Sequence, residues 1–128
     1  MNLLLDTHTL LFFVNDNPLL SDTARNEIED NANEIYVSIV SAWEVAIKSS
    51  LNKLQIPKPV EIFIPEQLQL NDFHLLPVKI SHLGVVAKFP FHHRDPFDRM
   101  LAAQSIAENF SIISIDGKLD AYGVNRIW

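Results

Sequence analysis

The chain has 128 residues, 48% of them hydrophobic, and this length suits one domain with a hydrophobic core, which we expect to span residues 1–128. It has no cysteine, which excludes disulfides, thiolate metal ligands and a cysteine nucleophile, and it shows neither a signal peptide nor an apolar run long enough for a membrane span, so we expect a cytoplasmic protein. A net charge of −6 disfavours nucleic-acid binding, which usually needs a basic face, unless several acids are gathered around cations.

The first half of the chain alternates strands with helices. The stretch Asn2–Thr7 contains three consecutive leucines, which predict a strand buried on both faces, and Asp6 follows them directly. Residues 41–44 match the capping-box pattern, so we expect Ser41 to start a helix whose apolar spacing places Trp43 in the core. The expected elements are helix Thr7–Val14, helix Ser21–Asn31, strand Glu34–Ser38 and helix Ser41–Leu54.

The second half continues the same alternation. Pro65 lies inside an apolar segment that otherwise predicts a helix, and Asp95 with Pro96 gives a typical helix start, with the acid at the cap and proline in the first helical position. The expected elements are helix Val60–Leu70, a short strand in Phe73–Val78, helix Ser81–Phe89 capped by Ser81, a helix from Asp95 to Asn109, strand Ser111–Ile115 and strand Val124–Trp128. The alternation predicts an α/β sandwich with a mostly parallel central sheet flanked by helices.

Four acids occupy the ends of these expected elements. Asp6 and Asp116 each end a strand, whereas Glu44 and Asp98 each lie in the first turn of a helix. In a parallel α/β sheet, the carboxyl ends of strands and the starts of the following helices share one edge. Clustered carboxylates persist when cations neutralise them, and hard divalent ions such as Mg²⁺ or Mn²⁺ prefer oxygen ligands. The pattern therefore predicts a metal site suited to phosphate chemistry.

Each acid also has a simpler structural explanation. Asp6 could only mark a strand end, and Glu44 could serve only the capping box. Asp98 could serve only the helix dipole, and Asp116-Gly117 could form a hairpin turn. Asp95 is best explained as a helix cap. It is the joint placement of the four acids at element ends that favours a common site.

Basic residues next to the Asp95 helix predict a surface that meets phosphates. We call this surface the basic lip, and its alternative is an ordinary solvated loop. Lys48 could add to the lip or only solubilise the surface, and Ser114, on the same face as Asp116, could bond a water at the metal or simply end a strand. A zinc site is disfavoured because the adjacent His92 and His93 do not project together. The basic lip comprises His92, His93, Arg94 and Arg99.

Several segments together resemble one protein family. The most specific is the run from His92 to Gln104, which contains His-Arg-Asp-Pro-Phe-Asp-Arg. These segments resemble the PIN-domain ribonucleases and, among them, the VapC-type toxins of bacterial toxin–antitoxin pairs. The others are Leu5-Asp6-Thr7-His8, Val37-Ser38, Ser41-Ala42-Trp43-Glu44 with Ile47-Lys48, and Ser114-Ile115-Asp116.

The resemblance implies a fold, an activity and partners. The implied fold is a PIN-like three-layer sandwich, and the family's acidic quartet corresponds to Asp6, Glu44, Asp98 and Asp116. Members use Mg²⁺ or Mn²⁺ to cut single-stranded or looped RNA. The toxins usually form homodimers and are held inactive by an antitoxin whose tail covers the acidic groove. Ser114 stands where many members have threonine, which keeps the hydroxyl group.

The leading hypothesis is therefore a metal-dependent endoribonuclease. One alternative is a small phosphatase or phosphoacceptor with Asp6 as nucleophile. Haloacid-dehalogenase phosphatases need a second aspartate two residues later, where this chain has His8, and the acidic pair of response-regulator receivers is absent. Another alternative is a non-catalytic, metal-stabilised binding module.

Overall fold

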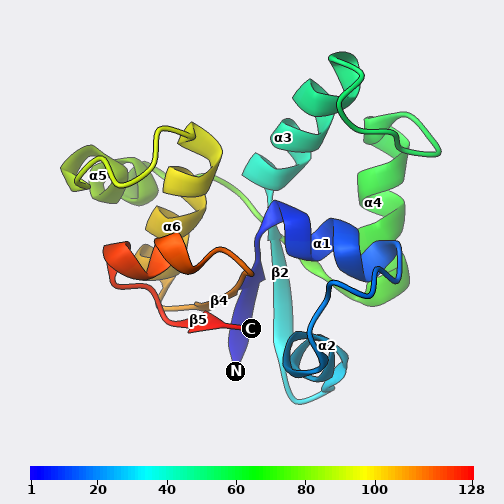
Figure 1. Ribbon diagram of the computed structural model, residues 1–128, viewed down its shortest axis with the longest axis horizontal. Coiled ribbons are helices and arrows are strands. Elements are labelled where there is room, and N and C mark those ends of the chain that lie inside the picture. Colours follow the sequence, from blue (N-terminus) through cyan, green and yellow to red (C-terminus); the bar gives the residue numbers. More distant parts are fainter.

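The computed structural model describes residues 1–128, and its five strands form one parallel sheet in the order β3-β2-β1-β4-β5 (Figure 1). The strands are β1 (Asn2–Leu5), β2 (Glu34–Ser38), β3 (His74–Leu76), β4 (Ser111–Ile113) and β5 (Arg126–Ile127). The helices are α1 (Thr7–Val14), α2 (Asp22–Glu29), α3 (Ile39–Ser50), α4 (Val60–Asn71), α5 (Ile80–Lys88), α6 (Pro96–Glu108) and the 3₁₀ helix η1 (Gly117–Tyr122). The expected α/β class with a parallel sheet is confirmed.

The leucines of β1 alternate between two hydrophobic cores, one on each face of the sheet. Leu3 and Leu5 pack with residues of α1, α2 and α4, whereas Leu4 packs with residues of α6 and η1. All three are fully buried, which explains why the central strand is a continuous apolar run. Figure 1 shows helices on both sides of the sheet, with α3 beyond the end of β2, where it packs against α1, α4 and α6. This confirms the three-layer sandwich.

Helix α3 begins two residues earlier than its expected start at Ser41. Ser38 is the cap, because its hydroxyl accepts the backbone N–H of Val40 at 3.0 Å, and the helix follows β2 without a loop. The expected capping box is therefore wrong. Ser41 lies inside the helix, where its hydroxyl accepts a bond from Thr7 at 3.0 Å, and Glu44 lies in the second turn rather than the first.

Two other helices also differ from the usual rules, α5 at its start and α4 in its interior. Helix α5 was expected to be capped by Ser81, but it begins at Ile80, and the backbone N–H of Lys79 donates to the His82 ring at 2.9 Å. Helix α4 forms despite Pro65, which lies exposed within it. Burial of Phe63 and Ile64 from the same helix against the leucine core outweighs the backbone hydrogen bond that proline cannot donate.

The last part of the chain crosses over rather than turning back. Ile112 pairs with Arg126 in parallel, with η1 between the two strands, so the alternative of a hairpin at Asp116-Gly117 is excluded. Strand β4 ends at Ile113, two residues before its expected end. None of the helices combines the length and apolarity needed to span a membrane.

Candidate functional site

Asp6 lies where the order of the strands reverses along the sheet. The chain runs from β1 to β2 and β3 on one side and returns to β4 and β5 on the other. The backbone N–H of Asp6 donates to the carbonyl of Ile113 at 3.2 Å, so this residue lies between the ends of β1 and β4. Its Oδ1 caps α1 by accepting the N–H of Thr9 at 2.8 Å, and the residue is 4% exposed. Ligands of open α/β sheets bind at this kind of switch point.

Glu44 reaches the same edge from α3. Its side chain is 3% exposed, and one carboxylate oxygen pairs with Lys48 one turn later. The other oxygen, Oε1, is buried and has no hydrogen-bond partner. Because buried polar atoms are almost always satisfied, this oxygen is available to bind a ligand.

Asp98 connects these two acids electrostatically. It lies in the first turn of α6, which Asp95 caps by accepting the N–H groups of Phe97 at 2.8 Å and of Asp98 at 3.4 Å. Burial, together with the negative charges of Asp95, Glu44 and Asp6, raises the pKa of Asp98 from 3.8 to about 6. These charge interactions bring Asp6, Glu44 and Asp98 near one another, and their common role stays a prediction.

Asp116 and Asp98 both lie close to His93. The Oδ2 atom of Asp116 lies 3.1 Å from Nε2 of His93, and its Oδ1 accepts the N–H of Lys118 at 3.0 Å to cap η1. Burial alone would raise the pKa of Asp116, but these two hydrogen bonds bring it below its ordinary value. One ligand atom each from His93, Asp98 and Asp116 lies within 4.8 Å of the others. Asp98 is thus common to both groups of acids.

The residues of the basic lip take different places. His92 and Arg94 are exposed, and the ring of His92 lies edge-on against Tyr122. His93 instead lies next to Asp116. Arg99 does not face phosphates as expected, because its guanidinium donates to the carbonyls of Pro90 and Val86 and is 9% exposed. Arg99 therefore serves the loop between α5 and α6.

Two residues near the acids have contacts that were not predicted from the sequence. Ser114 is fully buried, and its hydroxyl accepts the N–H of Asp116 at 3.0 Å, so it orients that acid. Lys48 pairs with Glu44, and this hydrogen bond raises the pKa of Lys48 against the effect of burial, with further help from the charges of Asp95 and Asp98. The spacing of four residues between Glu44 and Lys48 was the available signal for that pair.

The donor set suits a hard divalent cation. Four carboxylates lie at one edge, Glu44 offers an unpartnered buried oxygen, and burial with the neighbouring negative charges raises the pKa of Asp98. Mg²⁺ and Mn²⁺ bind oxygen ligands of this kind and would neutralise that charge.

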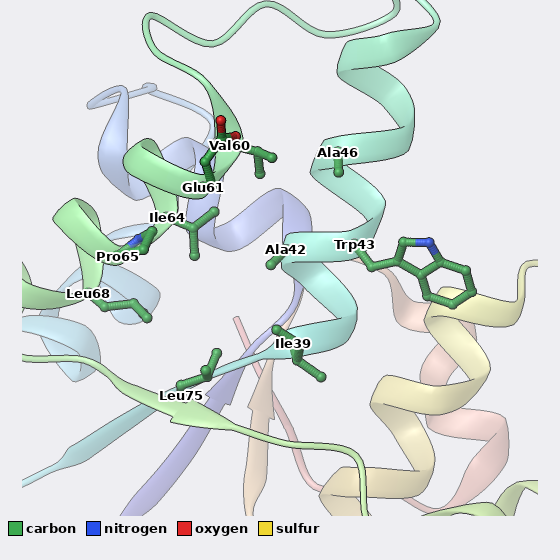
Figure 2. A pocket seen from close by; sticks show the side chains of 10 residues that line it. All are labelled: Ile39, Ala42, Trp43, Ala46, Val60, Glu61, Ile64, Pro65, Leu68 and Leu75. Atoms are coloured by element: carbon green, nitrogen blue, oxygen red, sulfur yellow. The ribbon is translucent and has the colours of Figure 1, made fainter.

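A second region of α3 has the opposite character. Trp43 is 57% exposed, so its expected place in the core is wrong. Figure 2 shows it at the rim of an apolar groove between α3 and α4, with its indole extended toward α6, where it lies edge-on to Phe97 at 4.9 Å between ring centroids. The groove has a volume of about 340 Å³, and Glu61 is its only charged lining residue. We call it the apolar groove. It is lined by Ile39, Ala42, Trp43, Ala46, Val60, Glu61, Ile64, Pro65, Leu68 and Leu75.

Known proteins match both the sequence and the fold. Over 69 residues, the chain is 37% identical to Ribonuclease VapC16 of Mycobacterium tuberculosis, and this alignment covers 51% of the chain and 49% of that relative, or about half of its length. The solved structure of VapBC2 from Rickettsia felis, bound to a DNA fragment from its promoter, covers 99% of this chain and 98% of its own at a TM-score of 0.75 and 17% identity. A toxin–antitoxin complex from Klebsiella pneumoniae covers 98% and 95%, at a TM-score of 0.58 and 10% identity.

The family assignment follows from the sequence match. A model of the PIN domain family matches residues 3–125, which is nearly the whole chain and includes all four acids at the sheet edge. The protein therefore belongs to the PIN domain family.

Proposed function

We propose that this protein is an endoribonuclease that depends on a divalent cation and acts as the toxin of a toxin–antitoxin pair. The observation that carries the proposal is the convergence of Asp6, Glu44 and Asp98 from three separate elements, so close that the charges of the first two raise the pKa of the third. Membership of the PIN domain family and the similarity to a relative named as a ribonuclease support the same activity.

The acids would hold the cation at the switch point of the sheet. Asp6 and Asp98 are the proposed principal ligands, with Glu44 offering its free Oε1 and Asp116 completing the set. A bound divalent cation supplies positive charge to the phosphodiester and makes water a better nucleophile at neutral pH. The chain's own residues orient these ligands, since Thr9 holds one oxygen of Asp6 and Ser114 holds the backbone of Asp116.

Substrate binding is proposed at the exposed part of the basic lip. His92 and Arg94 are exposed on the loop that leads into α6 and its Asp98, which places an imidazole and a guanidinium beside the acids. Lys48 lies on the other side, with its side chain 36% exposed. Together these groups would meet the phosphates of a single-stranded or looped RNA.

We further propose that the antitoxin occupies the apolar groove. Large exposed apolar patches mark interaction surfaces, and this one is rimmed by Trp43, one residue from Glu44. The solved structures of similar fold include protein complexes, one of them described as toxin and antitoxin. A homodimer is the proposed assembly, and exposed Ile80, Leu83 and Phe91 offer it an apolar surface, which sedimentation velocity would test.

The test is the single substitution Asp6→Asn. Asparagine keeps an oxygen to accept the Thr9 N–H, so the cap of α1 is preserved while the charge is lost. With labelled single-stranded and hairpin RNAs, we expect the wild-type protein to cut in Mg²⁺ or Mn²⁺ but not in EDTA. The variant should cut more than about 100-fold more slowly, with a nearly unchanged unfolding transition.

A matched control separates the site from charge in general. Asp30→Asn makes the same change at an exposed acid that accepts the N–H of Ala32. Asp30 precedes β2, so it lies at the end of the sheet opposite the four acids, and this variant should cut RNA like the wild type. Full activity in Asp6→Asn would refute the assignment. A wild-type protein that Mn²⁺ stabilises but that cuts no RNA would refute the nuclease and favour the binding module.

A further inference from the structure

His93 is the one histidine that the fold places among the acids, and three contacts fix it there. Its backbone N–H donates to the hydroxyl of Tyr122 at 2.8 Å, and its ring stacks on the Tyr122 ring with centroids 5.4 Å apart and planes 28° apart. Its Nε2 lies 3.1 Å from Asp116, and its side chain is only 7% exposed. The imidazole is therefore held in one place rather than lying loose on a solvated loop.

The loop that carries His93 is fixed at its other end by Arg99. The guanidinium donates to the carbonyl of Pro90 at 2.8 Å and of Val86 at 3.3 Å, and it lies 4.3 Å from the centre of the Phe91 ring. Arg99 directly follows Asp98 in α6, so the same turn of helix presents the acid and anchors the histidine loop.

The hydrogen bonding of the ring leaves one nitrogen unused. An ionised Asp116 only accepts, so Nε2 donates its proton to it, and in the neutral ring Nδ1 carries the lone pair. Nδ1 is buried and has no hydrogen-bond partner, as is also true of Oε1 of Glu44. Buried polar atoms are almost always satisfied, so each of these two atoms is available to bind a ligand.

The spacing of the three side chains fits one ion. A ring nitrogen of His93 and one oxygen each of Asp98 and Asp116 lie within 4.8 Å of one another. Ligands about 2.1 Å from a common ion lie at most about 4.2 Å apart, so small rotations bring the three atoms to one centre.

We propose that His93 contributes an imidazole nitrogen to the divalent-cation site beside Asp98 and Asp116, and that this ligand makes the site prefer Mn²⁺ to Mg²⁺. The inference rests on the cation site of the proposed function and adds a nitrogen donor to its carboxylates. Mg²⁺ prefers oxygen ligands and retains its waters, whereas later divalent metals accept imidazole more readily. His93 is thereby a ligand rather than a member of the basic lip.

The direct test is pulsed electron paramagnetic resonance of the full chain loaded with one equivalent of Mn²⁺. We expect the echo modulation of the wild-type protein to show a ¹⁴N coupling typical of a directly bound imidazole. The coupling should vanish in His93→Gln and persist in His92→Gln, which removes the neighbouring exposed histidine. The bond between the residue 93 backbone and Tyr122 remains in the variant, so the loop keeps its anchor.

The outcomes separate this inference from the nuclease itself. Bound Mn²⁺ without ¹⁴N coupling, or coupling that survives in His93→Gln, overturns the histidine ligand and leaves the nuclease proposal standing. Failure of the wild type to bind Mn²⁺ overturns both.

A second measurement excludes a merely structural role for His93. Calorimetric titration of His93→Gln should show Mn²⁺ affinity reduced about tenfold or more and Mg²⁺ affinity reduced much less. Equal losses for the two ions would mean that His93 only orients Asp116 and would overturn the proposal. His93→Asn should behave like His93→Gln, which guards against an effect peculiar to one side chain.

Discussion

Helix α3 carries two opposite departures from ordinary protein surfaces, one residue apart. Glu44 is a buried charge with an unpartnered oxygen, whereas Trp43 is a large apolar side chain with more than half of its surface exposed. Buried acids and exposed tryptophans are both unusual in a self-sufficient domain. The acids of the site outnumber the one lysine that pairs with them, Lys48, and the apolar groove leaves Trp43 uncovered. We therefore propose an ion as the ligand of the first region and a protein as that of the second.

Substituting Glu44→Gln should give the largest effect and separate the two regions most clearly. Glutamine keeps the shape of the side chain but removes the charge that would face the cation, so RNA cleavage should fall by about 100-fold. Trp43→Ala, the adjacent residue, should leave cleavage by the free protein unchanged. Initial rates on one labelled RNA compare them directly. Equal losses in both variants would mean that the groove and the site are one surface.

Trp43→Ala should instead act on the partner. Removing an exposed indole from the rim of the apolar groove should weaken antitoxin binding by at least about 2 kcal/mol, or roughly 30-fold in Kd. Calorimetry with the purified antitoxin measures this, and Glu44→Gln serves as the control expected to keep most of the affinity. Unchanged binding by Trp43→Ala would place the antitoxin elsewhere.

Asp98→Asn should stabilise the protein when no metal is present. The folded-state pKa of Asp98 is about 6, above the 3.8 of the unfolded chain, so its contribution to stability is fully present below pH 3.8 and is lost as the pH rises through 6. Asparagine avoids that loss, so in EDTA the variant should melt roughly a few degrees higher at pH 7.5, with a smaller advantage at pH 5. Saturating Mn²⁺ should reverse the order, because only the wild type binds the ion well. A lower melting point for Asp98→Asn in EDTA at pH 7.5 would contradict the conclusion that the ionised form of Asp98 destabilises the metal-free protein.

Ser41→Ala should produce the smallest effect, on the packing between the two helices that carry Asp6 and Glu44. It removes the acceptor of the Thr7 hydroxyl within the buried contact of α1 and α3, at a cost of about 1 kcal/mol in unfolding free energy. Adding Thr7→Val should recover part of this loss, because no unsatisfied hydroxyl then remains. Urea unfolding of the two variants measures both steps. Further destabilisation by the second change would show that the hydroxyl of Thr7 has another role.

The fold and the meeting of the acids could be predicted because both follow from local chain geometry. A run of leucines that ends in Asp6 fixes a central buried strand and its carboxyl edge, and the Asp95-Pro96 cap fixes the start of α6 and hence the place of Asp98. The start of α3 was predicted wrongly because two serines, Ser38 and Ser41, could each cap it. Only the direct continuation of β2 into the helix decides between them.

Residues whose partners lie far along the chain could not be placed in this way. Arg99 appeared to be a phosphate ligand, but the carbonyls it binds belong to a loop whose path the sequence does not reveal. Trp43 has the spacing of a core residue, and periodicity alone does not distinguish a face that packs on its own sheet from one that awaits a partner. Tyr122 holds His93, but it belongs to no sequence motif that would have indicated this contact.

The pairing of β1 with β4 has a consequence for how the protein is made. Leu3 is matched with Ser111, so the middle of the sheet joins segments more than one hundred residues apart, and such distant contacts form slowly. A ribosome that has translated only the first ninety codons has produced Asp6 and Glu44 but neither the strand beside them nor the two remaining acids. Under the proposed function, a nascent or prematurely terminated chain should therefore cut no RNA, and cleavage should begin only with the finished polypeptide.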